Sequence, residues 1–261
     1  MDLRSEFGDI DIYVFDQLLR GRIVSASASA SASASASAAA GRYGETSPKL
    51  ADSSASEGGP GIRVFDAGCG GGRNLVYLLR QGFDVFGNDA SPDAIAKVRA
   101  LAAALAGGRT SDFRHEAIED TSFEDASADV VMASAVLHFA RDDAHFEAMV
   151  RALWRVLKPG GVFFARLAST IGMEGRVQPL GHNPAFAADG RYGEASPKLA
   201  PATRASGGGR YRLLDGSDRY LVDAPTILEW TRRLGGELID PIKTTVVHDQ
   251  RSMTTWVARR R

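Results

Sequence analysis

The stretch VFDAGCGGGRN, residues 64–74, decides the fold. It overlaps a short apolar run, residues 62–65, that is typical of a buried strand. Asp66 stands at the end of that strand, several glycines follow it, and a helical pattern continues to Arg80. A strand, a glycine turn and a helix in this order present a helix N-terminus to a ligand in α/β proteins. The stretch therefore predicts a binding site at the end of the first strand.

The spacing of the glycines distinguishes two classes of cofactor. Dinucleotide-binding turns usually read G-x-G-x-x-G and hold a pyrophosphate at the helix N-terminus. Here the glycines read G-x-G-G-G from Gly68 to Gly72, and Asp66 stands two residues before the first of them. A carboxylate would repel a pyrophosphate but attract the α-amino group of S-adenosylmethionine, which carries no phosphate. The turn therefore favours S-adenosylmethionine, and the alternative is a tight turn that serves packing alone.

A second acid, Asp89, ends the apolar stretch DVFGND of residues 84–89. It follows Gly68 by about 20 residues, the distance at which nucleotide-binding α/β units place a carboxylate on the ribose hydroxyls. A charged acceptor is suited to two hydroxyl hydrogen bonds. We therefore expect Asp89 to bind a ribose, and the alternative is a residue that only caps the turn.

The run D-x-G-C-G-x-G-R-N, followed by YLLRQGFDVFGNDAS, resembles motif I and the acidic second strand of class I S-adenosylmethionine-dependent methyltransferases. The run GRN-x-x-YL-x-x-x-G is similar to the tellurite-resistance type and related small-molecule enzymes. The resemblance implies an α/β fold with a Rossmann-like, seven-stranded, mostly parallel sheet, whose last strand is antiparallel, and helices on both faces. It also implies transfer of a methyl group from S-adenosylmethionine to a small-molecule acceptor.

The resemblance also implies roles for single residues. Asp66 and the glycine loop would hold the methionine end of the cofactor, and Arg73 would pair with its carboxylate. The segment after the third strand would line the adenine through backbone groups, although Glu116 could instead be a solvated loop charge. The expected cofactor-binding residues are Asp66, Gly68, Gly70, Gly72, Arg73, Asn74, Asp89, Ala90, Glu116, Ala117, Ile118 and Ser134.

Two polar residues follow the expected fourth and fifth strands. The stretch ADVVMASAVLHF, residues 128–139, is continuously apolar at its start, as in a parallel strand buried on both faces. His138 lies beyond the ligand-binding end of that strand and is a candidate general base, or a histidine that only shapes the loop. Arg166, near the end of the strand expected at residues 162–169, is the second candidate catalytic residue.

We expect three parts in the chain: a helical lid in residues 1–24, a flexible low-complexity insertion in residues 25–60, and the cofactor-binding domain in residues 61–261. The insertion alternates serine and alanine, whose side chains are too small to bury a face. A further insertion at about residues 170–222 holds the hairpin sequence RYRLLDGSDRYLV, whose polar and aromatic side chains could line a pocket for an anionic or aromatic substrate or could simply be exposed.

A short segment of sequence occurs once in each of the two insertions. GRYGETSPKLA at residues 41–51 returns as GRYGEASPKLA at residues 190–200. The pair is either a docking peptide used twice or, in our preferred interpretation, a duplicated insert in two tolerant loops. The run NPAF at residues 183–186 is similar to a signature of amino-group methyltransferases, but it stands in the wrong place and is interpreted as chance.

Composition narrows the function further. The chain has 261 residues, a formal net charge of −1 and one cysteine, Cys69. The small net charge disfavours nucleic acid as a partner. The lack of a long apolar run disfavours a segment that spans a membrane. The lack of a leader predicts a cytoplasmic enzyme. No metal-ligand cluster is visible and no metal is expected. A nicotinamide-dependent oxidoreductase and a non-catalytic S-adenosylmethionine-binding protein remain the alternative functions, and the oligomeric state is not predicted.

Overall fold

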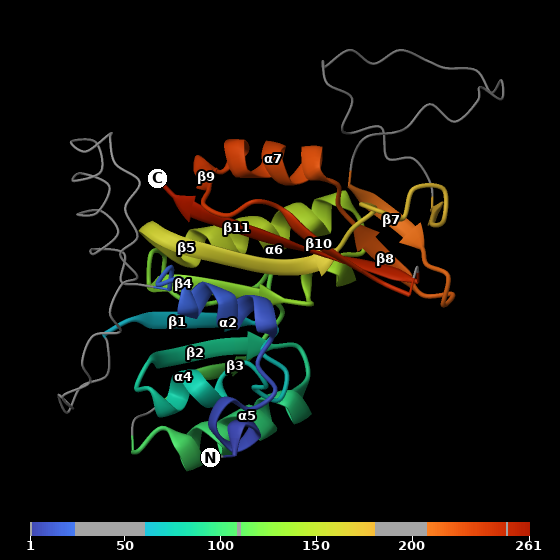
Figure 1. Cartoon of the computed structure of the whole chain (residues 1–261). Coiled ribbons are helices and arrows are strands. Elements are labelled where there is room, and N and C mark those ends of the chain that lie inside the picture. Colours follow the sequence, from blue (N-terminus) through green and yellow to red (C-terminus); the bar gives the residue numbers. More distant parts are fainter. Residues whose placement is uncertain (1, 24–60, 109–110, 181–207, 249) are drawn as a thin grey trace, which may run out of the picture.

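The computed structural model describes all residues except 1, 24–60, 109–110, 181–207 and 249 (Figure 1). The low-complexity insertion of residues 25–60, both copies of the repeated segment and the NPAF run therefore lie outside the described residues.

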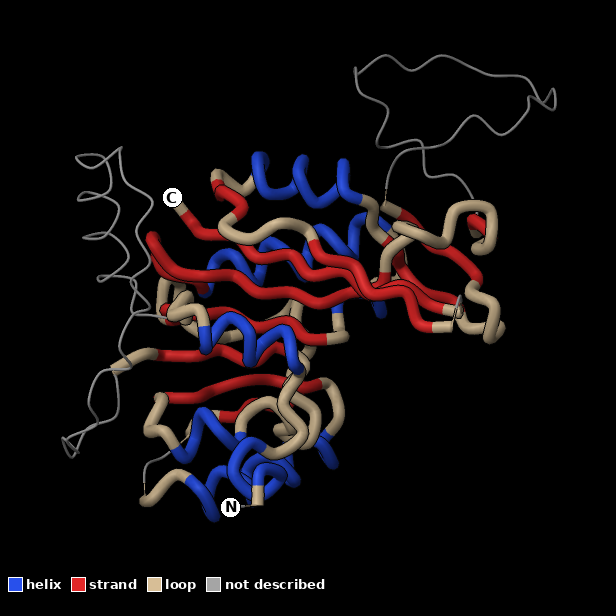
Figure 2. The backbone as a smooth tube through the Cα atoms, in the orientation of Figure 1, coloured by secondary structure: helices blue, strands red, loops and turns tan. Residues whose placement is uncertain are grey.

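One sheet of eight strands forms the centre of the described structure, in the order β10-β11-β5-β4-β1-β2-β3, with β9 paired to β11 (Figures 1 and 2). The strands from β3 to β5 in this order pair in parallel, and the last strand of the chain, β11, is antiparallel to β5. This confirms the predicted Rossmann-like sheet with a reversed last strand. The strands are β1 (Arg63–Ala67), β2 (Asp84–Asp89), β3 (Phe113–His115), β4 (Ala128–Ser134), β5 (Leu157–Ala168), β9 (Gly236–Leu238), β10 (Lys243–Val247) and β11 (Arg251–Arg260).

The C-terminal part of the sheet differs from the sequence prediction. Residues 238–247 were expected to form one strand, but β9 ends at Leu238 and β10 begins at Lys243. Pro241 lies between them, and proline has no N–H for a strand ladder. The interruption leaves Asp240 on the connecting segment, where its side chain is buried and meets the N-terminal helix.

Most helices begin with a side-chain cap. Asp11, Ser91, Asp142 and Asp223 each accept a backbone N–H of the first helical turn. The helix after the glycine loop was expected from Asn74, but it begins at Val76 because a backbone bond from Leu75 to Gly72 extends the turn. The helices are α1 (Leu3–Phe7), which was not predicted, α2 (Ile12–Leu19), α4 (Val76–Arg80), α5 (Pro92–Leu105), the 3-10 helix η1 (Leu137–Phe139), α6 (Asp143–Val156) and α7 (Ala224–Arg233).

The parallel strands have an apolar cluster on each face. Successive residues of β1, Val64 and Phe65, belong to different clusters, because neighbouring side chains of a strand point to opposite faces. Buried residues of α6 and α7 join the cluster of Phe65, and those of α2, α4 and α5 join the cluster of Val64. Both faces of the sheet are therefore covered, and its carboxyl edge remains for a ligand.

The insertion after β5 forms the predicted hairpin. Strand β7 (Gly209–Arg212) pairs antiparallel with β8 (Asp218–Leu221), and β6 (Gln178–Pro179) pairs with β7. A bridge between Ser169 and Val222 joins the end of β8 to the end of β5. This connection holds the hairpin beside η1, at the same edge of the sheet as the glycine loop (Figure 1). Among the described residues, no helix is long and apolar enough to cross a membrane.

Candidate functional site

The glycine loop after β1 has the conformation that its sequence predicts. Gly68, Gly70 and Gly72 all have positive φ, at 64°, 55° and 83°. A Cβ on Gly68 would lie 2.5 Å from Cγ2 of Val136, whereas a Cβ on Gly70 would meet no protein atom within 4 Å. Gly68 is therefore required by packing against the segment before η1, and Gly70 faces open space.

Asp66 is buried at the end of β1, with 2% of its surface exposed. Its Oδ2 atom has no hydrogen-bond partner among the described residues. Burial raises the pKa of this carboxyl to about 7, the positive charge of Arg73 lowers it, and the nearby Asp89 raises it further. A buried carboxylate oxygen without a donor is the kind of group that a ligand ammonium would satisfy.

Asp89 holds the glycine loop in place. Its Oδ2 accepts the backbone N–H of Gly70 at 2.9 Å, and its Oδ1 accepts that of Ser91 at 2.8 Å. The neighbouring Asn88 side chain accepts from Gly68 N and donates to the carbonyl of Ala117. The end of β2 therefore supports both the glycine loop and the segment after β3. Contact of Asp89 with a ribose stays a prediction.

The side chains of residues 116–118, which were predicted to line an adenine, mostly contact other parts of the protein. The Glu116 carboxylate accepts from the Thr121 and Ser122 side chains at 3.2 and 2.8 Å, which agrees with a structural loop charge. Ile118 is buried in the core, and the carbonyl of Ala90 lies 3.0 Å from His115 Nε2. The carbonyls of Ala117 and Ile118 already accept hydrogen bonds from Asn88 and Thr121, so the backbone N–H groups of these two residues remain for the predicted role.

A cavity of about 390 Å³ opens over the glycine loop. Its volume lies within the range of small-ligand sites. Six predicted residues line it, namely Gly68, Gly70, Gly72, Arg73, Asn74 and Ser134; Asp66, Asp89, Ala90, Glu116, Ala117 and Ile118 are not among its lining residues. Gly8 and Asp9, between α1 and α2, also line the cavity and were not predicted. The N-terminal segment therefore covers the loop.

Asp11 joins three of the predicted residues and was missed by the sequence analysis. Its carboxylate, 2% exposed, lies 2.9 Å from Nη1 of Arg166 and 3.5 Å from Nη2 of Arg73. Ser134 Oγ lies 3.4 Å from the same oxygen, and Asn74 Oδ1 accepts the backbone N–H of Asp11 at 3.0 Å. The position of Asp11 before an apolar helix is typical of a helix cap. No local sequence pattern indicates its contact with β5.

Replacing Asp11 with asparagine tests this cluster. Asparagine also caps helices, so the N-cap of α2 is retained while the charge that faces Arg166 and Arg73 is lost. We expect the free energy of unfolding to fall by about 2 kcal/mol, measured by urea denaturation. Asp16→Asn is the matched control, because the Asp16 side chain is 30% exposed and is expected to contribute less than about 1 kcal/mol. Equal losses in the two variants would contradict a special role for Asp11.

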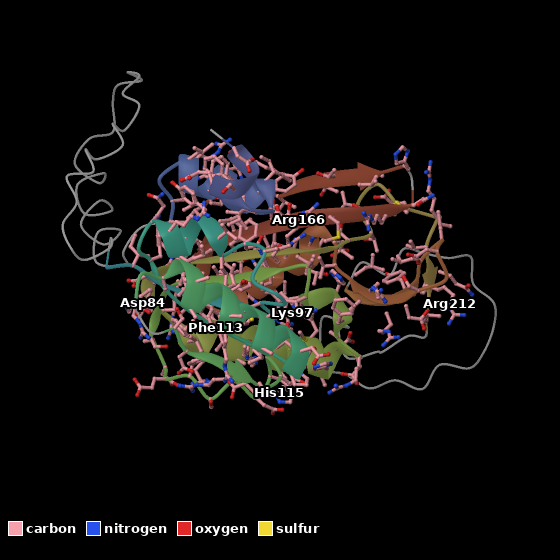
Figure 3. All side chains as sticks on the ribbon, turned by 90° about the horizontal axis from the view of Figure 1, so that it is seen from below. Asp84, Lys97, Phe113, His115, Arg166 and Arg212 are labelled. Atoms are coloured by element: carbon pink, nitrogen blue, oxygen red, sulfur yellow. The ribbon has the colours of Figure 1, made fainter. Side chains whose placement is uncertain are left out.

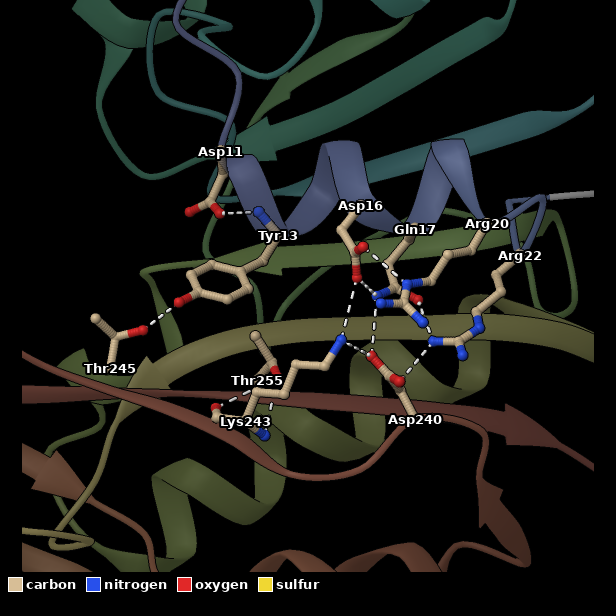
Figure 4. Close-up of polar contacts among 10 residues, drawn as sticks. All are labelled: Asp11, Tyr13, Asp16, Gln17, Arg20, Arg22, Asp240, Lys243, Thr245 and Thr255. Carbon is tan, nitrogen blue, oxygen red and sulfur yellow. Dashed lines mark hydrogen bonds and ion pairs between the residues drawn. The ribbon is translucent and has the colours of Figure 1, made fainter.

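The other end of α2 is held by a network with the C-terminal strands (Figure 4). Lys243 lies 2.8 Å from Asp240 and 3.1 Å from Asp16, and Arg22 lies 2.7 Å from Asp240. Gln17 also donates to Asp240, and the Tyr13 hydroxyl bonds Thr245. Tyr13 and Gln17 therefore anchor α2 to the C-terminal part of the chain.

His138 and Arg166 lie at the same edge of the sheet. His138 is 8% exposed, and its Nδ1 atom has no partner among the described residues. Burial, followed by the positive charges of Arg219 and Arg166, lowers the pKa of His138 to about 4. Its imidazole is therefore neutral at physiological pH. The Arg166 guanidinium also lies 5.1 Å from the centre of the Tyr13 ring, beside the N-terminal helices (Figure 3).

Two other chemistries receive no support from the described residues. Burial and the nearby Asp66 and Asp89 charges raise the pKa of the Cys69 thiol, which keeps it protonated and unreactive. In the described ranges, no group of three or more histidine, cysteine, aspartate or glutamate side chains is arranged to hold a metal ion.

Comparisons with known proteins show what this domain is similar to. The family described as "Methyltransferase domain" matches residues 65–165, from β1 to β5.

Residues 65–165 resemble a methyltransferase domain.

Curated relatives resemble this methyltransferase domain over a similar length. An uncharacterised methyltransferase of Synechocystis sp. is 38% identical over 106 residues, which are 40% of this chain and 46% of that protein. A ubiquinone biosynthesis O-methyltransferase of Methylocella silvestris is 38% identical over 105 residues, 40% of this chain and 39% of that protein. The chain thus spans less than half the length of these relatives.

A solved structure resembles the chain beyond the methyltransferase domain. It is the 1,6-didemethyltoxoflavin-N1-methyltransferase of Burkholderia thailandensis, with bound 1,6-didemethyltoxoflavin and S-adenosylhomocysteine. The match covers 77% of this chain and 71% of that chain, with a TM-score of 0.52 and 18% identity. At this identity the likeness concerns the fold, which agrees with the class I methyltransferase fold implied by the sequence. The narrower similarity to the tellurite-resistance type stays a prediction.

Proposed function

We propose that this protein transfers a methyl group from S-adenosylmethionine to a small-molecule acceptor. The observation that carries the proposal is Asp66, a buried carboxylate with an unpartnered oxygen beside a positive-φ glycine loop. An ammonium group would satisfy this oxygen, whereas a diphosphate would meet a buried acid. The relatives named as methyltransferases and the S-adenosylhomocysteine in the Burkholderia structure support the same cofactor.

The residues around the loop fit the other parts of this cofactor. Arg73 is half exposed at the cavity, where its guanidinium suits the methionine carboxylate. Asp89 is kept in place by two backbone N–H groups and suits the ribose. Because Gly70 faces open space, the backbone leaves room for a ligand to approach. S-Adenosylmethionine would supply an activated methyl group, so the chain has to orient the acceptor and exclude water.

His138 is our candidate for receiving the acceptor's proton. Its neutral imidazole has a free Nδ1 atom, and Val136, two residues earlier, packs on Gly68 of the cofactor loop. This short connection puts the base and the loop at one edge of the sheet. The names of the ubiquinone biosynthesis relatives support oxygen as the methylated atom. We propose Arg166 as the residue that positions His138 and Asp11 relative to each other.

Calorimetry and product analysis test the proposed function. We expect wild-type protein to bind S-adenosylmethionine and not NAD, and to form S-adenosylhomocysteine when a small-molecule extract is added. Binding of NAD alone would support the oxidoreductase instead. Binding of S-adenosylmethionine with no S-adenosylhomocysteine formed from any extract would support the non-catalytic alternative. A small-molecule acceptor, a cytoplasmic location and independence from nucleic acid and membranes remain part of the proposal.

His138→Gln tests the base separately from cofactor binding. We expect the rate of methyl incorporation to fall by about 100-fold, because a positioned base contributes that much, while the affinity for S-adenosylmethionine stays the same. His145→Gln is the control. His145 lies on α6 and forms an ion pair with Glu119 at 2.8 Å, so its replacement should leave the rate of methyl incorporation unchanged. An unchanged rate in His138→Gln would reduce His138 to a residue that shapes the loop.

A further inference from the structure

The β7–β8 hairpin carries a cation, Arg219, that forms no direct ion pair with a described residue, although its charge helps to lower the pKa of Asp215 at the hairpin turn. The Asp218 carboxylate is occupied by Arg212 at 2.9 Å and by Arg210 at 3.5 Å. Arg219 donates only to the backbone carbonyl of Asp218, at 2.8 Å, and forms no ion pair with any of the described residues. The hairpin therefore presents one guanidinium that is available to an external anion.

This guanidinium lies over an exposed aromatic ring next to His138. The Arg219 guanidinium carbon is 4.9 Å from the centre of the Phe139 ring, and Phe139 is 55% exposed. The Phe139 and His138 rings are 4.7 Å apart, and β8 packs directly against η1. A cation, an apolar ring and a buried unpartnered imidazole nitrogen are therefore grouped at the edge that faces the cofactor loop.

The charges around this group favour an anion. Arg166 forms an ion pair with Asp11, whereas Arg219 forms none with the described residues and acts on Asp215 only at longer range. Tyr220, which follows Arg219, donates its hydroxyl to Asp143 at 2.9 Å, so the Asp143 carboxylate on α6 already has a partner. A ligand carboxylate would meet the planar donor fork of Arg219 without displacing an acid of the protein.

Resting on the function proposed above, we propose that the methyl acceptor is a hydroxylated aromatic acid. Its carboxylate pairs with Arg219, its ring packs on Phe139, and its hydroxyl faces His138. In the reaction, the acceptor oxygen bonds to the methyl carbon, the bond from that carbon to the sulfonium sulfur breaks, and its electron pair stays on sulfur. The hydroxyl proton passes to the imidazole of His138.

The anion also explains how a weakly basic histidine receives this proton. The positive charge of Arg219 is the largest charge effect that lowers the pKa of His138. A carboxylate bound to Arg219 opposes that effect and raises the pKa toward its ordinary value. Acid binding would therefore prepare the base, and a neutral analogue would not.

Matched acids and amides test the acceptor class. The probes are the three ring isomers of hydroxyphenylacetate and their amides, titrated by calorimetry into protein saturated with S-adenosylhomocysteine. We expect at least one acid to bind about tenfold more tightly than its amide, and Arg219→Gln to remove the difference. Arg212→Gln, an exposed arginine of the same hairpin, should leave the difference intact (Figure 3).

The outcomes separate this inference from the proposed function. Failure of wild-type protein to bind S-adenosylhomocysteine overturns the proposed function. Normal binding of S-adenosylhomocysteine, combined with equal affinity for acids and amides or with no bound acid, overturns the acceptor class alone. NMR titration of His138 gives a second readout, in which Arg219→Gln raises its pKa and Arg212→Gln does not. An unchanged pKa in Arg219→Gln would contradict the proximity on which the inference rests.

Discussion

Asp66→Asn is expected to weaken binding of S-adenosylmethionine by about 100-fold, because the ammonium of the cofactor loses its charged acceptor in a buried site. The same change should stabilise the protein without ligand at pH 8. The folded-state pKa of Asp66 is raised to about 7, so the stability that this shift costs is lost in full above that pH. We expect a gain of about 1–2 kcal/mol in the free energy of unfolding.

The pH dependence of this gain follows from the sign of the shift. The folded state binds the proton more tightly than the unfolded chain, whose carboxyl has the ordinary pKa of 3.8. The stability of the wild type therefore falls as pH rises from about 4 to about 7, and the gain in Asp66→Asn shrinks toward acid pH. Asp84→Asn is the control, because Asp84 is half exposed on β2 and pairs only with Arg63. Calorimetry and urea denaturation at several pH values measure both effects, and unchanged cofactor affinity in Asp66→Asn would contradict the assignment.

Gly68→Ala should cause the largest loss of stability. The residue has φ of 64°, and its new Cβ would lie 2.5 Å from Val136. A left-handed alanine costs about 1 kcal/mol, and overpacking adds about 2 kcal/mol, so we expect a loss of about 3 kcal/mol in the free energy of unfolding. Displacement of Val136 would also disturb η1 and the cofactor loop, which should reduce the affinity for S-adenosylmethionine.

Gly216→Ala isolates the backbone contribution. Gly216 also has positive φ, at 78°, but its Cβ would meet no protein atom within 4 Å. We expect this hairpin variant to lose about 1 kcal/mol and to retain its affinity for S-adenosylmethionine. Urea denaturation measures the free energy of unfolding of both variants. If Gly68→Ala and Gly216→Ala lose the same amount, the close contact with Val136 is not the reason for glycine at position 68.

Most strands and helices could be placed along the chain, and the last strand predicted as reversed, because local patterns and the family resemblance agree. The apolar run of β4, the cap residue Asp223 before α7 and the Asp215–Gly216 turn are all visible in the sequence. The break between β9 and β10 was not predicted, because β-forming residues stand on both sides of Pro241. Proline lacks the N–H that a continuous strand would need at this position. Patterns of this kind describe neighbours along the chain, and they were sufficient for most of the fold.

The candidate site was predicted less completely, because part of it is assembled from distant segments. The glycine loop is a local feature and was found. The contact between Asp11 and Arg166 joins residues 155 positions apart, and Gly8 reaches the cavity from a helix pair whose docking has no sequence signature. Asp89 also acts on the loop in a way that its spacing did not indicate, since it accepts the N–H of Gly70. Such contacts depend on tertiary packing.

The network of Figure 4 determines when during protein synthesis the N-terminal helix docks. Asp16 is bound by Lys243, 227 residues later in the chain, and Tyr13 by Thr245. These partners of α2 therefore exist only once the ribosome has translated β10. Until then, α2 lacks these contacts with the C-terminal strands, although β1 to β5 have already been made.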